Sequence, residues 1–178
     1  MRIEVAMRGV LFRAPAVLML LTAGIAAEEH KAPLDKLEQL MKDYSVAMRS
    51  GDKAKQLEML KKVRPTKEDL ATLKAERADD LLAAIERSLA YFEKNLAEIA
   101  AEEARGGEFK SAIAAEDERV NSKKERGPFG VDMKFYKVLT KYENGGGGRS
   151  GFLYVNGRWL WLNFWISPEE AEKLQPKK

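Results

Sequence analysis

The chain has 178 residues, with 31 basic and 28 acidic side chains, no cysteine and one histidine, His30. Without cysteine there is no disulfide framework and no thiol chemistry, and a single histidine argues against ordinary zinc sites and against a serine–histidine–aspartate triad. The near balance of charge argues against a nucleic-acid-binding protein, so we expect no nucleic-acid partner, no metal site and no cofactor.

Residues 1–26 have the features of a secretory signal peptide. Arg2, Arg8 and Arg13 give a basic start, and residues 14–27 form an uncharged, largely apolar run. This run of 14 residues is shorter than the roughly 20 residues that a membrane-spanning helix needs. Small residues favour cleavage after Ala26, so we expect export to the periplasm or the medium. An uncleaved N-terminal anchor is the alternative, and it is the one expected contact with a membrane.

Removal of the signal leaves 152 residues with 28 basic and 27 acidic side chains, a length that suits one domain with a core. Within residues 27–178, we expect helices over 33–105, an antiparallel sheet over 108–166 and a short terminal helix over 167–175. Helices followed by consecutive strands indicate an α+β fold. We expect three to four helices and about four strands packed on the long helix.

Local signals delimit the helices that precede the long one. The first begins near Pro33, and Gly51 suits the left-handed position that follows a helix. Asp52 is suited to cap a second, short helix. Thr66, with Asp69 three residues later, predicts a capping box for a third. The apolar residues of the first helix recur at spacings of three and four: Leu37, Leu40, Met41, Tyr44, Ala47 and Met48.

The longest predicted helix covers residues 78–105. Its apolar stripe, again at spacings of three and four, consists of Leu82, Ile85, Leu89, Phe92, Leu96 and Ile99. Such a stripe is typical of a coiled-coil partner surface or of a helix that packs on its own sheet. It covers about two and a half heptads, whereas a coiled coil needs about three to four. We therefore expect this helix to pack on the sheet.

The second half of the domain predicts strands at residues 109–115 and 131–142. In the longer strand, Val131, Met133, Phe135 and Leu139 are expected on one face, and Tyr136, Val138 and Tyr142 on the other. Residues 117–129 and 143–151 are expected to be loops, and the second contains four consecutive glycines. No Gly-Lys-Ser/Thr follows these glycines, so a flexible hairpin loop is expected there rather than a phosphate cradle.

The terminal hairpin is the sharpest local signal. Asn156-Gly157 between two apolar runs predicts a two-residue turn, because both turn positions need positive φ. The expected pairs are Val155 with Arg158, Tyr154 with Trp159, Leu153 with Leu160, and Phe152 with Trp161. Alternation places Phe152, Tyr154, Trp159 and Trp161 on one face, and Leu153, Val155, Leu160 and Leu162 on the other. Both faces are apolar, so both should be covered.

The aromatic face of this hairpin is the candidate site. It can be core, can line a pocket for a flat or apolar ligand, or can form a protein interface. If it lines a pocket, the ligand-binding residues are Tyr154, Trp159 and Trp161, with Tyr136 and Tyr142 from the neighbouring strand. The expected partner is therefore a small apolar or aromatic ligand or another protein, with the chain as a monomer or homodimer.

The order of elements resembles the cone-shaped α+β superfamily named after the nuclear transport factor, which includes ketosteroid-isomerase-like and polyketide-cyclase-like proteins. The resemblance rests on helix, Ser50-Gly51-Asp52, short helix within residues 44–60, and on the closing hairpin of residues 155–159. Uncharacterised exported bacterial proteins look similar there. The catalytic Asp and Tyr of the isomerase members have no matching position in this sequence. The resemblance thus implies the fold without the chemistry.

These observations predict an exported, non-catalytic domain that binds a small ligand or a partner. The acid pairs Asp79-Asp80, Glu102-Glu103 and Asp117-Glu118 are interpreted as surface, since neighbours on a helix do not face each other. An isomerase- or hydrolase-like enzyme is one alternative. It requires a carboxylate base in the cavity, and Asp132 is the first candidate. A helical adaptor that uses the apolar stripe between Leu82 and Ile99 is the other alternative.

Overall fold

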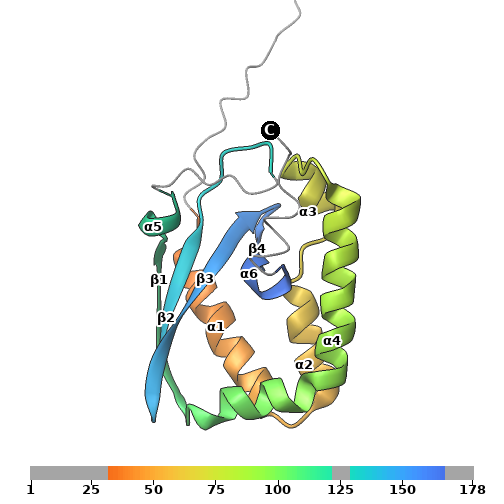
Figure 1. Cartoon of the computed structure of the whole chain (residues 1–178). Helices are drawn as coiled ribbons and strands as arrows, with labels where there is room; N and C mark the ends of the chain where they lie inside the picture. Colours follow the sequence, from red (N-terminus) through yellow and green to blue (C-terminus); the bar gives the residue numbers. More distant parts are fainter. Residues whose placement is uncertain (1–31, 122–128, 167–178) are drawn as a thin grey trace, which may run out of the picture. The chain divides into compact units, whose positions relative to one another are not determined.

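The computed structural model describes residues 32–121 and 129–166. They form an α+β fold in which four helices precede a four-stranded antiparallel sheet (Figure 1). The predicted signal peptide with its cleavage site, and the predicted terminal helix at 167–175, lie outside the described residues. In chain order the elements are α1 (Leu34–Arg49), α2 (Lys53–Lys62), α3 (Lys67–Thr72), α4 (Ala78–Arg105), β1 (Phe109–Glu116), α5 (Glu118–Asn121), β2 (Tyr136–Tyr142), β3 (Gly145–Val155), β4 (Arg158–Trp161) and α6 (Leu162–Trp165).

The predicted helix boundaries are confirmed by their caps. Gly51 follows α1 with a φ of 70°. The Asp52 carboxylate accepts hydrogen bonds from the backbone N–H groups of Ala54 (3.0 Å) and Lys55 (3.2 Å) at the start of α2. Thr66 and Asp69 form the predicted capping box of α3. The two N-terminal caps, Asp52 and Thr66, accept from N–H groups that have no partner within the helix.

Helix α4 has the predicted bounds, and its apolar stripe packs within the domain. Ile85 and Leu96 are buried, and the other four stripe residues pack against the core of the domain. Asn95 departs from helical geometry, with φ −106° and ψ 18°, so the helix is kinked there. In Figure 1 the turns after the kink run beneath α1 toward β1. Among the described residues, no helix combines the length and apolar character needed to cross a membrane.

The sheet has the order β1-β2-β3-β4, with every neighbouring pair antiparallel. The predicted hairpin register is confirmed for all four pairs, from Val155 with Arg158 to Phe152 with Trp161. Asn156 and Gly157 both have positive φ, at 51° and 77°. The predicted alternation in β2 is also observed: Tyr136, Val138, Thr140 and Tyr142 are buried, whereas Leu139 is 56 % exposed.

The glycine-rich segment corrects one prediction. Residues 143–151 were expected to be a loop, but the turn is confined to Glu143 and Asn144, and β3 begins at Gly145. The four glycines pair with residues 139–142 of β2. The physical reason is that β2 is rich in β-forming residues and supplies a hydrogen-bonding template, which outweighs the weak strand preference of glycine.

The longer predicted strand is also shorter than expected, because residues 131–135 are not paired. Asn121 interrupts the strand: its side-chain oxygen accepts from the Phe135 N–H (2.8 Å), and its amide donates to the Phe135 carbonyl (3.1 Å). The Asp117 N–H donates to the same carbonyl (2.8 Å). The Phe135 backbone is therefore satisfied by the short helix α5 rather than by a neighbouring strand.

Helix α1 is the helix that lies on the sheet, where the long helix was expected. Its Glu38 carboxylate accepts a hydrogen bond from the Ala114 N–H of β1 (2.9 Å). Helix α4 packs on the far side of α1, and in Figure 1 it reaches the sheet at its C-terminal end. The kink at Asn95 explains this arrangement, because it turns only the last part of α4 toward β1.

Candidate functional site

Four of the five predicted ligand-binding side chains are buried, and Tyr154 is half-buried; the four are Tyr136, Tyr142, Trp159 and Trp161. Trp159 packs edge-on against Tyr136, with ring centroids 5.1 Å apart. Trp161 packs edge-on against Tyr44 of α1, at 5.5 Å. The aromatic face is therefore largely covered by the chain's own side chains. Trp159 and Tyr142 also line two separate surface pockets, so the five residues do not surround one cavity.

A buried ion pair lies where α4 meets the sheet. Glu103 of α4 is 8 % exposed, and its carboxylate accepts hydrogen bonds from the Arg149 guanidinium and the Tyr142 hydroxyl. Arg149 also donates to the Thr140 hydroxyl (2.9 Å) and to the Tyr142 oxygen (3.0 Å). The arginine comes from β3 and the acid from α4, so this cluster joins the two halves of the chain.

Aromatic rings surround the Arg149 guanidinium. Its carbon lies 5.7 Å from the ring centroid of Tyr44, 5.8 Å from that of Tyr142 and 5.9 Å from that of Trp161, within the range of cation–π attraction. Burial, followed by the nearby Glu103 charge, raises the pKa of Tyr44 far above its ordinary value. Burial and the hydrogen bond to Glu103 also raise the pKa of Tyr142. Both phenols therefore stay protonated at neutral pH.

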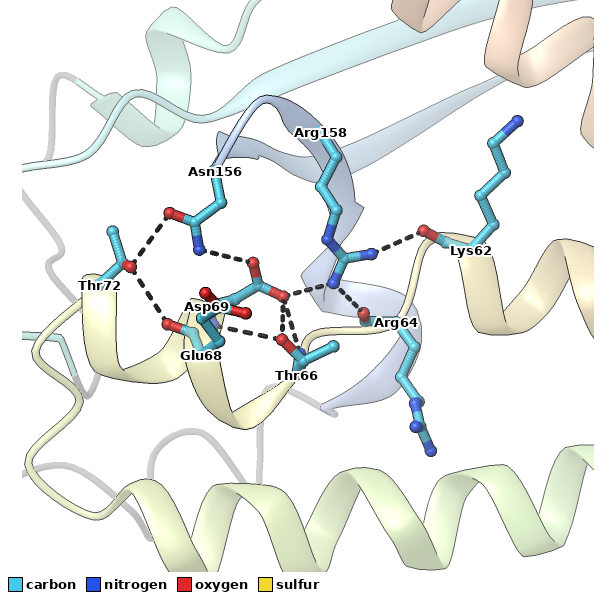
Figure 2. A network of polar contacts seen from close by, with 8 residues as sticks. All are labelled: Lys62, Arg64, Thr66, Glu68, Asp69, Thr72, Asn156 and Arg158. Atoms are coloured by element: carbon cyan, nitrogen blue, oxygen red, sulfur yellow. Dashed lines mark hydrogen bonds and ion pairs between the residues drawn. The ribbon is translucent and has the colours of Figure 1, made fainter.

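A second buried acid, Asp69, joins α3 to the β3–β4 turn (Figure 2). One carboxylate oxygen accepts from the Thr66 N–H (2.9 Å) and hydroxyl (2.7 Å), and also from the Arg158 guanidinium. The other accepts from the Asn156 side-chain amide (3.1 Å). The Thr72 hydroxyl lies 3.1 Å from the Asn156 side-chain oxygen. The turn residue Asn156 thus has a second role besides its positive φ.

Arg158 is held on both sides in the same network. Its guanidinium donates to the carbonyls of Lys62 (2.9 Å) and Arg64 (2.8 Å), in addition to Asp69. Burial alone would raise the pKa of Asp69, but the hydrogen bonds from Arg158 and Thr66 outweigh it, so the pKa lies below its usual value. The carboxylate is therefore a charged structural group, and its acceptor positions are already occupied.

A pocket of about 270 Å³ opens between α1 and the β3–β4 turn. Leu40 and Trp159 supply its apolar wall. Gln39 donates to Asp43 (2.7 Å), so the acid in the lining already has a hydrogen-bond partner. The rest of the lining consists of Lys36, Lys62, Gly157 and Arg158. Ligand pockets typically measure about 300–1,000 Å³, so this one suits a small molecule.

The lining of this pocket has a net positive charge, with Lys36, Lys62 and Arg158 against Asp43. Lys36 and Lys62 are exposed, and neither forms an ion pair within residues 32–121 and 129–166. Arg158 adds a third cation, but its donors are directed to Asp69 and to backbone carbonyls. The two lysines are consequently the groups available to an anion, and their alkyl stems can extend the apolar wall.

Sequence reasoning missed the buried acids. Glu103 and Asp117 were interpreted as surface, yet they are 8 % and 5 % exposed. A signal for Glu103 was present, since it follows Ile99 by four residues and continues the apolar stripe of α4. Its partner Arg149 could not be found, because that segment was expected to be a loop. Asp132, the first candidate base, is exposed and lies in the irregular segment before β2.

Within the described part of the chain, no group of three or more His, Asp or Glu side chains is placed to hold a metal ion. No protein-family model, curated protein or solved structure matches the chain.

Proposed function

We propose that the chain is an exported, non-catalytic domain that binds a small amphipathic anion in the pocket between α1 and the β3–β4 turn. The observation that carries the proposal is the combination in one pocket of an apolar wall, Leu40 and Trp159, with two lysines that have no ion-pair partner among the described residues, Lys36 and Lys62. The pocket volume of about 270 Å³ fits one ring system or a short chain.

The chemistry of the ligand follows from the two ends of the pocket. A flat or apolar body would lie against Trp159, and a carboxylate, sulfate or phosphate would lie between the lysines. Lysine is a compact point charge without the forked geometry of arginine. The proposed site therefore selects for negative charge and apolar shape more than for one particular acid group.

The binding test compares a naphthalene carboxylate with the uncharged naphthyl alcohol by isothermal titration calorimetry on the full chain. We expect saturable binding of the carboxylate and weaker binding of the alcohol. The double variant Lys36→Gln/Lys62→Gln should weaken the carboxylate about two- to thirtyfold, on the scale of two exposed charge pairs, and leave the alcohol unchanged. If the double variant binds the carboxylate as tightly as the parent does, the proposed role of the lysines is refuted.

Two further variants separate the pocket from the rest of the surface. Gln39→Trp, at the exposed rim, fills the pocket and should abolish binding of both probes. Lys42→Gln/Lys53→Gln removes the same charge from exposed positions outside the pocket and should change neither affinity. Thermal unfolding of each variant checks that it is folded. Retained binding by folded Gln39→Trp would place the ligand elsewhere.

Export is proposed on the sequence of residues 1–27, with a basic start, an uncharged run and small residues around Ala26. The test is intact mass measurement of the chain from its host after cell fractionation. We expect a mature N-terminus at Ala27 in the exported fraction. An intact N-terminus in the cytosolic fraction would refute the signal peptide, and an intact N-terminus in the membrane fraction would favour the anchor.

The two rival functions have less support. The buried carboxylates of Asp69 and Glu103 are each paired with an arginine, and Asp132 is exposed, so these three acids are poor candidates for a base in a cavity. The apolar stripe of α4 packs in the domain's own core, which leaves little of it for an adaptor surface. Kinship with the nuclear-transport-factor superfamily remains a proposal, supported by the helix, Gly51-Asp52, helix order and the closing hairpin.

A further inference from the structure

The first half of β3 has an open edge. Residues 152–155 of β3 pair with β4 on one side, and the Ser150 carbonyl accepts from the Trp161 indole N–H (3.1 Å), whereas residues 145–149 pair with β2 alone. β4 ends at Trp161, where the chain turns into α6, so among the described residues no strand lies beside residues 145–149. Gly145 to Gly148 are all exposed. An edge of this kind presents unpaired backbone N–H and C=O groups.

Each outer strand of the sheet has an edge N–H group that is taken by another element. On β1, the free N–H of Ala114 is taken by the Glu38 carboxylate of α1 (2.9 Å). On β4, the Trp161 N–H donates to the Val63 carbonyl (3.0 Å). Natural sheets commonly protect edges with charge, bulges or covering elements. No described residue covers the glycine half of β3 in this way. Its four glycines also place no charged side chain along the edge.

Two of these glycines are not required by the fold. An added Cβ at Gly147 would meet no atom within 4 Å, and one at Gly148 would make an ordinary contact of 3.5 Å with Leu139. Neither has the left-handed φ that favours glycine. By contrast, a Cβ at Gly146 would lie 2.7 Å from the Thr140 carbonyl oxygen. Glycine inside a strand is destabilising relative to alanine, so its presence at two permissive positions calls for another reason.

The neighbouring strand supplies that reason. On the outer face of β2, Lys141 lies opposite Gly146 and Leu139 opposite Gly148. Lys137 lies opposite Ser150, so the row reads Lys-x-Leu-x-Lys across an almost bare strand. Because the glycines have no side chains, the lysines can lean over β3 toward its open edge. Neither lysine forms an ion pair with any described residue.

The centre of this face is apolar and exposed. Leu139 pairs across the strands with Ile113 of β1, and the two side chains are 56 % and 63 % exposed. An open depression of about 560 Å³ runs over residues 139–143 and 145–147. The surface therefore combines backbone hydrogen-bonding groups, an apolar centre and two flanking positive charges.

We propose that the open edge of β3 at residues 145–149 binds an extended acidic strand from a partner protein. A strand added beside β3 would lie about 10 Å from β2, two strand spacings away. Side chains on its outer face would then alternate with a period of two. An acid opposite Gly146 meets Lys141, and an apolar residue opposite Gly148 meets Leu139. A second acid just beyond the paired segment, beside Ser150, reaches Lys137. The matching segment reads Glu-x-apolar-x-Glu, and its backbone supplies the hydrogen bonds.

Charge selects this occupant over a second copy of the chain. Antiparallel pairing of two copies about Gly148 would set Lys137 of one copy level with Lys141 of the other, on the same face of the joined sheet. Two β3 strands separate these lysines, but their long side chains lean toward the shared edge, where like charges repel. An acidic strand removes that repulsion, and this proposal does not depend on the small-ligand pocket.

The test uses the full chain labelled with nitrogen-15 and a capped synthetic peptide, Thr-Glu-Thr-Val-Thr-Glu-Thr. We expect saturable shifts of the amide signals of Gly146, Gly147 and Gly148. The matched peptide with Lys in place of Glu should bind at least tenfold more weakly. A third peptide carries N-methyl groups on the alternate amides that would donate to β3. It should also bind at least tenfold more weakly, because those amides can no longer form hydrogen bonds. Absent glycine shifts at millimolar peptide, or equal binding of the Lys peptide, would overturn the proposal.

Variants separate the edge from general surface charge. Lys137→Gln/Lys141→Gln should weaken the acidic peptide about two- to thirtyfold and reduce its salt dependence, whereas Lys42→Gln/Lys53→Gln should not. Glycine shifts that depend on protein concentration without peptide would identify a second copy as the occupant. Binding to anionic lipid vesicles without binding to the peptide would identify a membrane surface. Either result would overturn the proposed partner.

Discussion

Replacement of Asp69 by Asn tests how strongly the β3–β4 turn is fixed to the helices. Asp69 is 1 % exposed, and removal of one partner from a fully buried ion pair costs about 3–5 kcal/mol. The Arg158 side chain is 33 % exposed and keeps two carbonyl acceptors, and Asn can still accept from Thr66. We therefore expect Asp69→Asn to lower the free energy of unfolding by about 2–3 kcal/mol, or roughly 4–12 °C in Tm.

The effect of this substitution should depend on pH. The folded-state pKa of Asp69 is lowered, so its charge stabilises the fold above the unfolded pKa of about 3.9. This contribution is lost as the pH falls through the lower folded-state pKa. The difference in unfolding free energy between parent and Asp69→Asn should therefore be largest near neutral pH and should shrink below about pH 4. Urea unfolding followed by tryptophan fluorescence at both pH values measures it.

Two comparisons complete the test. Glu68→Gln changes an exposed acid in the same first turn of α3 and should stay within about 0.5 kcal/mol of the parent. Arg158→Met leaves the Asp69 carboxylate buried without its cation. It should therefore lower the free energy of unfolding more than Asp69→Asn does, by about 3–5 kcal/mol. The reasoning is refuted if Asp69→Asn is as stable as Glu68→Gln at pH 7. It is also refuted if the difference in unfolding free energy between the parent and Asp69→Asn is the same at pH 3 as at pH 7.

Three further predictions use the same urea titration. Ser45→Ala should raise the free energy of unfolding by up to about 1 kcal/mol, because the buried hydroxyl has no hydrogen-bond partner among the described residues; a loss would show that it has one. Gly151→Ala should lower it by about 2–4 kcal/mol, since φ is 83° and the Cβ would lie 2.2 Å from an α6 side chain, whereas Gly147→Ala should not. Tyr142→Phe should lower it by about 1–3 kcal/mol through loss of the hydrogen bond to Glu103; an unchanged value would contradict that bond.

The parts of the fold that were predictable are those set by short-range chemistry. Asn156-Gly157 determined the hairpin register because a two-residue turn allows one pairing. Asp52 and Thr66 marked helix starts because their side chains accept from the backbone two or three residues later. In each case the residues that decide the structure lie within a few positions of one another, so the local sequence carries the information.

The parts that failed depend on partners distant in the sequence. The glycines after Asn144 form a strand because β2 lies beside them, and Phe135 stays outside the sheet because Asn121 takes its backbone groups. The burial of Glu103 depends on Arg149, 46 residues away. Neither local preference nor periodicity contains these contacts. For the candidate site, the aromatic residues were found, but their packing against Tyr44 was not.

The two arginines inside the domain also limit what the surface can recognise. Arg149 and Arg158 each come from the sheet and each neutralise a buried acid of the helical half, Glu103 and Asp69. Hydrophobic contact is non-directional, whereas these pairs specify which strand residue meets which helix residue. Their forked donors are consequently committed to the interior. The cations left available at the proposed pocket and edge are lysines, so recognition of anions there rests on charge and shape, with little discrimination among carboxylate, sulfate and phosphate.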